Sequence, residues 1–199
     1  MTPVFDLGNV LIRWEPQAAF RHAFADDAEI DAFFARIGFY DWNYEQDRGR
    51  SRAEAVAAIA ALHPQHADLM DGFFDRFHLT IRDKIVGSWQ LLADLRARGH
   101  APWALTNWGP ETWPEAPRLH PELMDMFEGI VVSGHEGMVK PDCAIFDLLC
   151  DRAGATAERC FFIDDSAANV EGARAAGWQA HHFTGADDLR ANLRERGLL

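Results

Sequence analysis

The sequence lacks the features that would mark a disulfide-rich, zinc-stabilised or membrane-embedded protein. Only three cysteines occur among 199 residues, Cys143, Cys150 and Cys160, and none forms a CxxC pair. Their odd number and spacing argue against a disulfide framework or a structural zinc site. No apolar run is long enough to span a bilayer, and no leader pattern precedes the first apolar run. We therefore expect a cytoplasmic protein with no membrane partner.

Basic residues are also scarce. The sequence has 19 Lys and Arg residues against 31 Asp and Glu residues, which gives a formal net charge of −12. A sequence-independent nucleic-acid binder needs a basic face, so we expect no nucleic-acid partner. If so acidic a protein binds a phosphate group, a metal ion or a well-placed lysine must supply the local positive charge. The hydrophobic fraction of 48% is sufficient for a substantial core.

Short apolar runs bounded by turn residues predict five buried strands. Helical patterns that end in glycine alternate with the later strands. This alternation predicts an α/β fold with a Rossmann-like parallel sheet. The predicted strands are Pro3–Phe5, Ala101–Leu105, Gly129–Val132, Cys160–Ile163 and Trp178–His182, and the helices between or after them are Val86–Arg98, Asp142–Ala153, Ala167–Ala176 and Asp187–Arg196.

The segment after the first strand has a different pattern, with helical spacing only. Ser51 followed by Glu54 is typical of a capping box at the start of one of its helices. We therefore predict a core domain of residues 1–13 and 85–199, interrupted by a helical cap of residues 14–84. The expected cap helices are Glu15–Phe24, Asp27–Ile37, Ser51–Leu62 and Gln65–Phe77.

Polar residues with related chemistry come just after four apolar runs of the sequence. They are Asp6, Thr106 with Asn107, Lys140, and Asp164 with Asp165. Each alone is usually a turn residue or a helix cap. Because parallel strands bring their carboxyl ends to one edge of a sheet, where ligands bind, we expect these groups to meet there.

Together these residues can perform phosphoryl transfer. The Asp6 carboxylate can attack phosphorus and form an aspartyl-phosphate. Gly8 is expected to let the backbone turn tightly, so that N–H groups at Leu7 and Gly8 face phosphate oxygens. Thr106 offers a hydroxyl group, and Lys140 offers a positive charge to the transferring group.

Asp164 and Asp165 provide the hard oxygen ligands that Mg²⁺ prefers. A carboxylate nucleophile and a phosphate group repel each other, and a cation between them removes that repulsion. The sequence therefore predicts Mg²⁺ as cofactor, bound by Asp6, Asp164 and Asp165.

The motifs resemble those of the haloacid dehalogenase-like hydrolase superfamily, in particular a phosphatase branch with a small helical cap. An Asp-Leu-Gly-Asn-Val first motif is similar to that of bacterial sugar-1-phosphate phosphatases. The matching stretches extend from one end of the sheet domain to the other: Phe5-Asp6-Leu7-Gly8-Asn9-Val10, Leu105-Thr106-Asn107, Lys140-Pro141-Asp142 and Ile163-Asp164-Asp165, continuing to Asn169 and Ala176-Gly177.

The resemblance implies a magnesium-dependent phosphomonoester hydrolase that acts on a small phosphorylated metabolite, with sugar phosphates as candidates. It implies that Asn107 binds the phosphoryl group together with Thr106 and Lys140. It further implies that the Gly8 carbonyl is a metal ligand and that Asn169 orients a site residue. The cap is expected to close over the site and to select the substrate.

The chain departs from the phosphatase pattern at Gly8. Related phosphatases usually have a second Asp two residues after the nucleophile, which is the general acid for the leaving group. Loss of such a group commonly costs a factor of about 10² to 10⁴ in rate. A good leaving group, a cap residue such as Glu45 or Asp47, or low turnover would each account for Gly8. For both cap carboxylates, a solvated turn is the favoured interpretation.

Two alternatives remain open. L-2-haloacid dehalogenases of the same superfamily also lack the second Asp and need no metal, so Gly8 fits them. They have a Ser-x-Asn fourth motif where this chain has Asp164-Asp165-Ser166, and a Tyr where it has Phe146. The second alternative is a catalytically weak phosphate-binding protein.

Two tryptophans are candidates for a substrate pocket. Trp108 follows Thr106 and Asn107, and Trp14 begins the predicted cap. We expect them to face each other across the entrance, as walls for a sugar or another flat, partly apolar group.

Overall fold

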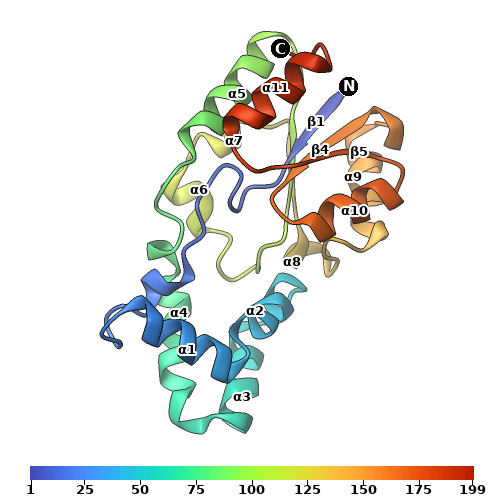
Figure 1. Ribbon diagram of the computed structural model, residues 1–199. Helices are drawn as coiled ribbons and strands as arrows, with labels where there is room; N and C mark the ends of the chain where they lie inside the picture. Colours follow the sequence, from blue (N-terminus) through green and yellow to red (C-terminus); the bar gives the residue numbers. More distant parts are fainter.

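The computed structural model describes all residues, 1–199, and contains one five-stranded parallel sheet in the order β3-β2-β1-β4-β5 (Figure 1). The predicted α/β class and all five predicted strands are confirmed. Phe5 at the end of β1 pairs with Ala104 of β2 on one side and with Ile163 of β4 on the other. The central position of β1 therefore brings the ends of three adjacent strands together. The strands are β1 (Thr2–Phe5), β2 (Trp103–Thr106), β3 (Gly129–Val132), β4 (Cys160–Asp164) and β5 (Gln179–His182).

Successive strand residues enter different cores, as the two-residue period of a strand requires. Phe5 and Phe161 belong to one apolar cluster, which includes leucines of α5 and α11. Val4 and Phe162 belong to a second cluster, which includes residues of α9 and α10. The sheet is therefore covered on both faces. These helices are α5 (Val86–Ala97), α9 (Cys143–Ala153), α10 (Ala167–Ala175) and α11 (Ala186–Glu195).

Four helices gather at the end of the molecule that faces the carboxyl edge of the sheet (Figure 1). Their core is aromatic and continuous with the core of the sheet, because Phe20, Phe33, Phe39 and Phe73 belong to the same cluster as Phe5. The domain boundaries after residues 13 and 84 stay a prediction. The helices are α1 (Asp27–Ile37), α2 (Phe39–Asp47), α3 (Arg52–Leu62) and α4 (Ala67–Arg76).

The short elements connect these parts. They are the 3₁₀ helices η1 (Pro16–Ala19), η2 (Pro64–His66), η3 (Phe77–Leu79) and η4 (Ala157–Arg159), and the helices α6 (Glu115–Leu119), α7 (Leu123–Met126) and α8 (Ser133–Glu136).

The cap segment confirms one local prediction and corrects another. Ser51 and Glu54 form the predicted capping box of α3. The predicted helix Glu15–Phe24 is wrong, because only η1 forms there. Phe20 then enters the aromatic cluster, with its ring centroid 5.1 Å from that of Phe34. Burial of this side chain decides the path of the chain over local helix propensity.

Helix α2 was not predicted from the sequence. Gly38 has a left-handed backbone with a φ of 65° and is both the last cap of α1 and the first cap of α2. The two helices thus follow each other without a loop, and a glycine that normally marks only a helix end marks a sharp change of direction. Residues of α2 line the pocket at the carboxyl edge of the sheet.

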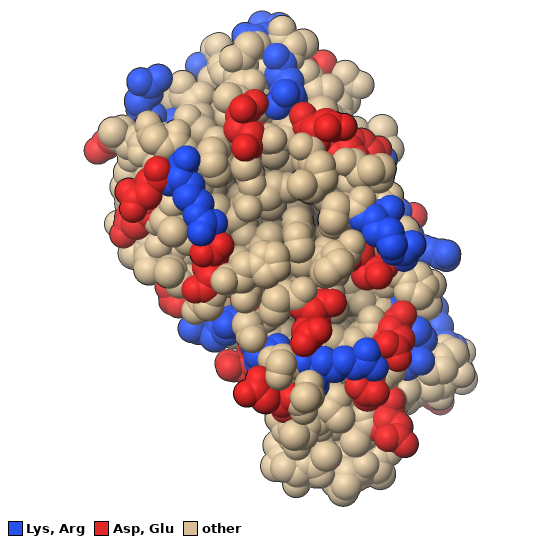
Figure 2. Space-filling model, turned by 180° about the vertical axis from the view of Figure 1, so that it is seen from behind, with Lys and Arg blue, Asp and Glu red and all other residues tan.

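None of the helices is both long and apolar enough to cross a membrane. On the face seen in Figure 2, Lys and Arg side chains are interspersed with Asp and Glu and do not form a continuous basic surface.

Candidate active site

The polar groups at the strand ends lie where the topology predicts. Asp6 directly follows β1, Thr106 ends β2, and Asp164 ends β4, with Asp165 next to it. Lys140 comes from the loop between α8 and α9. Because β1 lies between β2 and β4, these groups converge on Asp6 at the carboxyl edge of the sheet.

Lys140 lies at the centre of the cluster and is only 1% exposed. Its Nζ is 2.9 Å from Oδ1 of Asp6 and 2.7 Å from Oδ2 of Asp164, and it donates a hydrogen bond of 3.0 Å to the Leu105 carbonyl. Burial alone would lower the pKa of this ammonium, but the carboxylates of Asp164 and Asp6 outweigh burial and raise it. Lys140 is therefore a fixed positive charge beside the predicted nucleophile.

Two asparagines hold this charge cluster in place. Asn107 donates from Nδ2 to the Lys140 carbonyl and accepts from the Lys140 N–H, both at 2.9 Å. Asn169 donates from Nδ2 to both carboxylate oxygens of Asp164 at 3.1 Å. The Ser166 N–H donates to Asp164 as well, at 2.8 Å. Asp164 thus has partners on both oxygens, whereas Asp165 is half-buried and opens toward the pocket.

Three carboxylates form a set that fits a divalent cation. Asp6, Asp164 and Asp165 each offer an oxygen, and these oxygens lie within 4.8 Å of one another. Burial raises the pKa of Asp6 to about 7, which Lys140 opposes and the charges of Asp164 and Asp165 reinforce. The pKa of Asp165 is also raised, first by burial and then by Asp164. One lysine does not neutralise three carboxylates, and an oxygen-seeking cation such as Mg²⁺ supplies the missing charge.

The expectation that a tight backbone turn after Asp6 depends on Gly8 is wrong. A tight turn does not require glycine there, because Gly8 is outside the left-handed region and an added Cβ would meet nothing within 4 Å. The left-handed residue is Asn9, with a φ of 53°. Its Oδ1 accepts a 3.1 Å hydrogen bond from the Trp14 N–H, which connects the loop to the start of the cap segment. The Leu7 N–H donates to Oδ1 of Asp6 at 2.8 Å.

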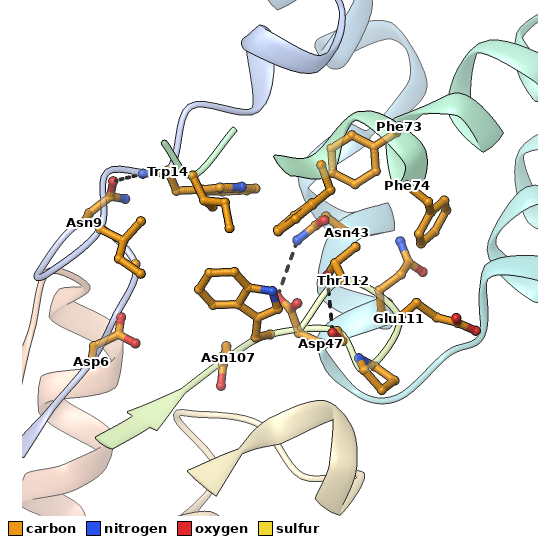
Figure 3. A pocket seen from close by; sticks show the side chains of 18 of the residues that line it. Asp6, Asn9, Trp14, Asn43, Asp47, Phe73, Phe74, Asn107, Glu111 and Thr112 are labelled. Atoms are coloured by element: carbon orange, nitrogen blue, oxygen red, sulfur yellow. Dashed lines mark hydrogen bonds between the residues drawn. The ribbon is translucent and has the colours of Figure 1, made fainter. Parts of the chain in front are cut away.

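A pocket opens above Asp6, between the sheet edge and the cap helices (Figure 3). Of the residues predicted from the sequence, Asp6, Gly8, Trp14, Asn107, Trp108 and Asp165 line it. Leu7, Thr106, Lys140, Asp164 and Asn169 are not part of its lining. Phosphate binding by Leu7, Gly8, Thr106 and Asn107 stays a prediction.

A sequence profile of the haloacid dehalogenase-like hydrolases matches residues 3–177. The chain belongs to this hydrolase family. A HAD family enzyme of Bacteroides thetaiotaomicron, solved in complex with magnesium and inorganic phosphate, superposes with a TM-score of 0.70 at 22% identity, over 92% of this chain and 94% of that one. The L-2-haloacid dehalogenase of Xanthobacter autotrophicus superposes with a TM-score of 0.62 at 18% identity, over 90% and 75% of the two chains. At these identities the two structures show a shared fold.

A curated relative of this haloacid dehalogenase-like hydrolase is the sesquiterpene phosphatase astK of Aspergillus oryzae. It is 33% identical over 109 residues, which are 55% of this chain and 54% of the phosphatase. The match therefore spans about half the length of this relative.

In this hydrolase, helix α2 and the segment directly after it contribute pocket residues, of which only Asp47 was among the candidates named from the sequence. Asn43, Gln46, Asp47 and Arg50 all line the pocket. The spacing i, i+3 and i+4 of Asn43, Gln46 and Asp47 places them on one side of α2, which is the signal that would have identified them, whereas Arg50 follows the end of this helix. The interpretation of Asp47 as a solvated turn residue is wrong. Glu45, by contrast, is exposed and does not line the pocket.

The upper walls of the pocket are apolar and largely aromatic (Figure 3). Trp14 and Trp108 both line it, as do Phe74 and Phe77 from the cap segment. Trp108 packs edge-to-face against Phe77, with ring centroids 5.7 Å apart. The charged floor around Asp6 is thus joined to a wall that favours an apolar group.

Proposed function

We propose that this hydrolase is a magnesium-dependent phosphomonoester hydrolase that forms an aspartyl-phosphate on Asp6. The observation that supports this most directly is the position of Asp6, whose carboxylate shares a buried lysine with Asp164 and lies beside Asp165. This cluster of opposite charges is suited to a dianionic substrate that arrives with a cation. Two similarities agree with this proposal. One relative is a sesquiterpene phosphatase, and one protein of the same fold was solved with magnesium and inorganic phosphate.

The residues divide the work as follows. The Asp6 carboxylate attacks phosphorus, and Lys140 stabilises the negative charge on the transferring group. The Asn107 side chain keeps Lys140 in place by its hydrogen bonds to the Lys140 backbone. Asp6, Asp164 and Asp165, with the Gly8 carbonyl, would hold Mg²⁺. When bound, the ion offsets the repulsion between nucleophile and phosphate and orients the phosphate oxygens.

We further propose that the substrate has an apolar organic part beside its phosphate. Trp14, Phe74, Phe77 and Trp108 offer large apolar surfaces and few hydrogen-bond groups. A sugar phosphate needs several polar partners for its hydroxyls, which Asn43 and other residues of α2 would have to supply. The Aspergillus oryzae relative is a sesquiterpene phosphatase, which agrees with an apolar substrate.

The decisive experiment is hydrolysis of p-nitrophenyl phosphate with Mg²⁺ or with EDTA. Wild-type protein should release phosphate only with Mg²⁺, and Asp6→Asn should abolish turnover. The exposed Asp68, which has no partner in the structure, provides the matched control Asp68→Asn, which should behave like wild type. Alkyl, isoprenyl and hexose phosphates then compare the two substrate classes by kcat/KM. Efficient turnover of hexose phosphates alone would refute the apolar substrate.

Gly8 favours a second candidate, an L-2-haloacid dehalogenase, because that reaction needs no acid at this position. The carboxylates of Asp164 and Asp165 beside Asp6 argue against it, since without a cation they hinder ionisation of the nucleophile. Halide release from 2-chloropropionate in EDTA, without phosphate ester hydrolysis, would favour the dehalogenase.

A further inference from the structure

The proposed hydrolysis needs a proton for the departing alkoxide, and Gly8, where related phosphatases usually have an aspartate, cannot supply one. Four carboxyl groups line the pocket: Asp6, Asp47, Glu111 and Asp165. Asp6 is the nucleophile, and Asp165 belongs to the cation site. Two candidates remain for a proton donor, Asp47 from the cap and Glu111 from the loop after β2.

Asp47 is held firmly in relation to the sheet. It is the last residue of α2, and its carbonyl accepts a 2.7 Å hydrogen bond from the hydroxyl of the buried Ser133. The same hydroxyl accepts the Trp108 N–H at 2.9 Å. Ser133 therefore ties the end of α2 to the loop that follows β2. The Asp47 side chain enters the pocket with Asn43, which donates to its Oδ2 at 3.5 Å (Figure 3).

Glu111 is placed differently. Its side chain is exposed, and its Oε1 accepts the backbone N–H of Arg52 at 3.3 Å. Glu111 therefore lies at the rim of the pocket, bound to the backbone of the cap, and is more exposed than Asp47.

The surroundings of Asp47 favour its protonated form. Burial raises the pKa of Asp47 to about 8; Lys140 opposes the rise, Asp6 adds to it, and the backbone of Gly109 lowers it slightly. The other charged groups that line the pocket are Arg50, Glu111 and Asp165. At neutral pH the group has a proton to give, and it places no negative charge opposite the phosphate.

We propose that Asp47 is the general acid of this site, in place of the carboxylate absent at Gly8. The proposal rests on the proposed phosphatase function. As the Asp6 carboxylate bonds to phosphorus, the bond from phosphorus to the ester oxygen breaks and its electron pair stays on that oxygen. Asp47 transfers its proton there, so that the product leaves as an alcohol. The Asp47 carboxylate then takes a proton from the water that hydrolyses the aspartyl-phosphate, which releases phosphate and restores both side chains.

The test compares leaving groups in the full-length protein with Mg²⁺. p-Nitrophenolate leaves without protonation, whereas the alkoxide of n-hexyl phosphate requires it. For Asp47→Asn we expect kcat/KM for n-hexyl phosphate to fall about 10²- to 10³-fold. For p-nitrophenyl phosphate it should fall less than about tenfold, because kcat/KM reports only the steps up to aspartyl-phosphate formation. Asp68→Asn, at an exposed aspartate outside the pocket lining, is the matched control and should leave both values near wild type. Glu111→Gln tests the competing candidate and should change both esters by a similar factor.

The pH profile gives a second readout. Wild-type kcat/KM for n-hexyl phosphate should fall above about pH 8, and this limb should be absent in Asp47→Asn. Equal losses for both esters, no loss for either, or a selective loss in Glu111→Gln would each overturn the assignment. Wild-type protein that hydrolyses neither ester would instead refute the phosphatase function, and the acid role with it.

Discussion

Asn107 and Lys140 hold each other through two hydrogen bonds of 2.9 Å between the Asn107 carboxamide and the Lys140 backbone. Asn107→Ala removes both bonds, which leaves the Lys140 N–H without a partner and its carbonyl with only the 3.4 Å hydrogen bond from the Tyr44 hydroxyl. We expect a stability loss of about 1–3 kcal/mol and a fall in kcat that exceeds the change in KM. Asn192→Ala is the control: Asn192 of α11 accepts a 2.7 Å hydrogen bond from Arg196, the residue after this helix, and lies outside the pocket lining. It should lower the melting temperature without changing kcat, and a similar loss of kcat in both variants would contradict the positioning role.

Lys140→Met tests the buried charge cluster. The variant leaves Asp6 and Asp164 buried without their cation, which typically costs about 3–5 kcal/mol. Removing Lys140 also removes the influence that lowers the pKa of Asp6. The variant can then relieve the repulsion by binding protons, so its deficit in urea denaturation with EDTA should be larger at pH 8 than at pH 5. A deficit that does not change with pH would show that lost packing, and not charge, is responsible.

Asp47→Asn should stabilise the protein while it impairs catalysis. The pKa of Asp47 is raised to about 8 from an ordinary value near 4, so the folded state retains a proton that the unfolded state has lost. The wild type therefore loses stability as pH rises from about 4 to 8, and the variant avoids this loss. Its advantage in urea denaturation should be absent near pH 4 and about 1–3 kcal/mol at pH 8. No gain at pH 8 would contradict the raised pKa.

Gly8→Asp tests whether the acid can be moved to the loop. An added Cβ at Gly8 meets open space, and its backbone is not left-handed, so we expect the variant to fold with near wild-type stability. In an Asp47→Asn background, the new carboxyl should raise kcat/KM for n-hexyl phosphate about tenfold or more over the single variant. p-Nitrophenyl phosphate should respond little. A melting temperature well below wild type would show that Gly8 is required for packing.

Phe74→Ala tests the apolar wall. Phe74 lines the pocket, whereas Phe24 is a cap phenylalanine that packs on Phe33 at 5.1 Å between ring centroids and does not line it. Loss of about 1.5–3 kcal/mol of apolar contact would raise KM for an isoprenyl phosphate roughly 10- to 100-fold. The KM for p-nitrophenyl phosphate should change less. Phe24→Ala should leave both values unchanged, and equal effects of the two variants would argue for a general loosening of the cap.

Much of the fold follows from local patterns. The strands and the four longer helices from residue 86 onward were predictable because short apolar runs, helical spacing and terminal glycines are set by neighbouring residues, whereas the short helices α6, α7 and α8 were not predicted. The parallel arrangement also explains why Asp6, Lys140 and Asp164 could be expected to meet, since strand ends share one edge. The cap was harder to predict. The predicted helix Glu15–Phe24 does not form because Phe20 packs against phenylalanines that are distant in the chain. Helix α2 follows α1 at Gly38 without a loop.

The sequence by itself determined the family, the nucleophile candidate and the absence of a carboxylate at Gly8. Only the tertiary structure decided what faces Asp6. Asp47 is 41 positions from Asp6 in the chain, and the sequence offered it only as one of two possible cap carboxylates, with a solvated turn as the favoured interpretation. Folding places it, half-buried, near Lys140 and Asp6, and the partial loss of surrounding water raises its pKa. A pKa depends on the dielectric surroundings and charges in space, and these exist only after the cap has packed against the sheet edge.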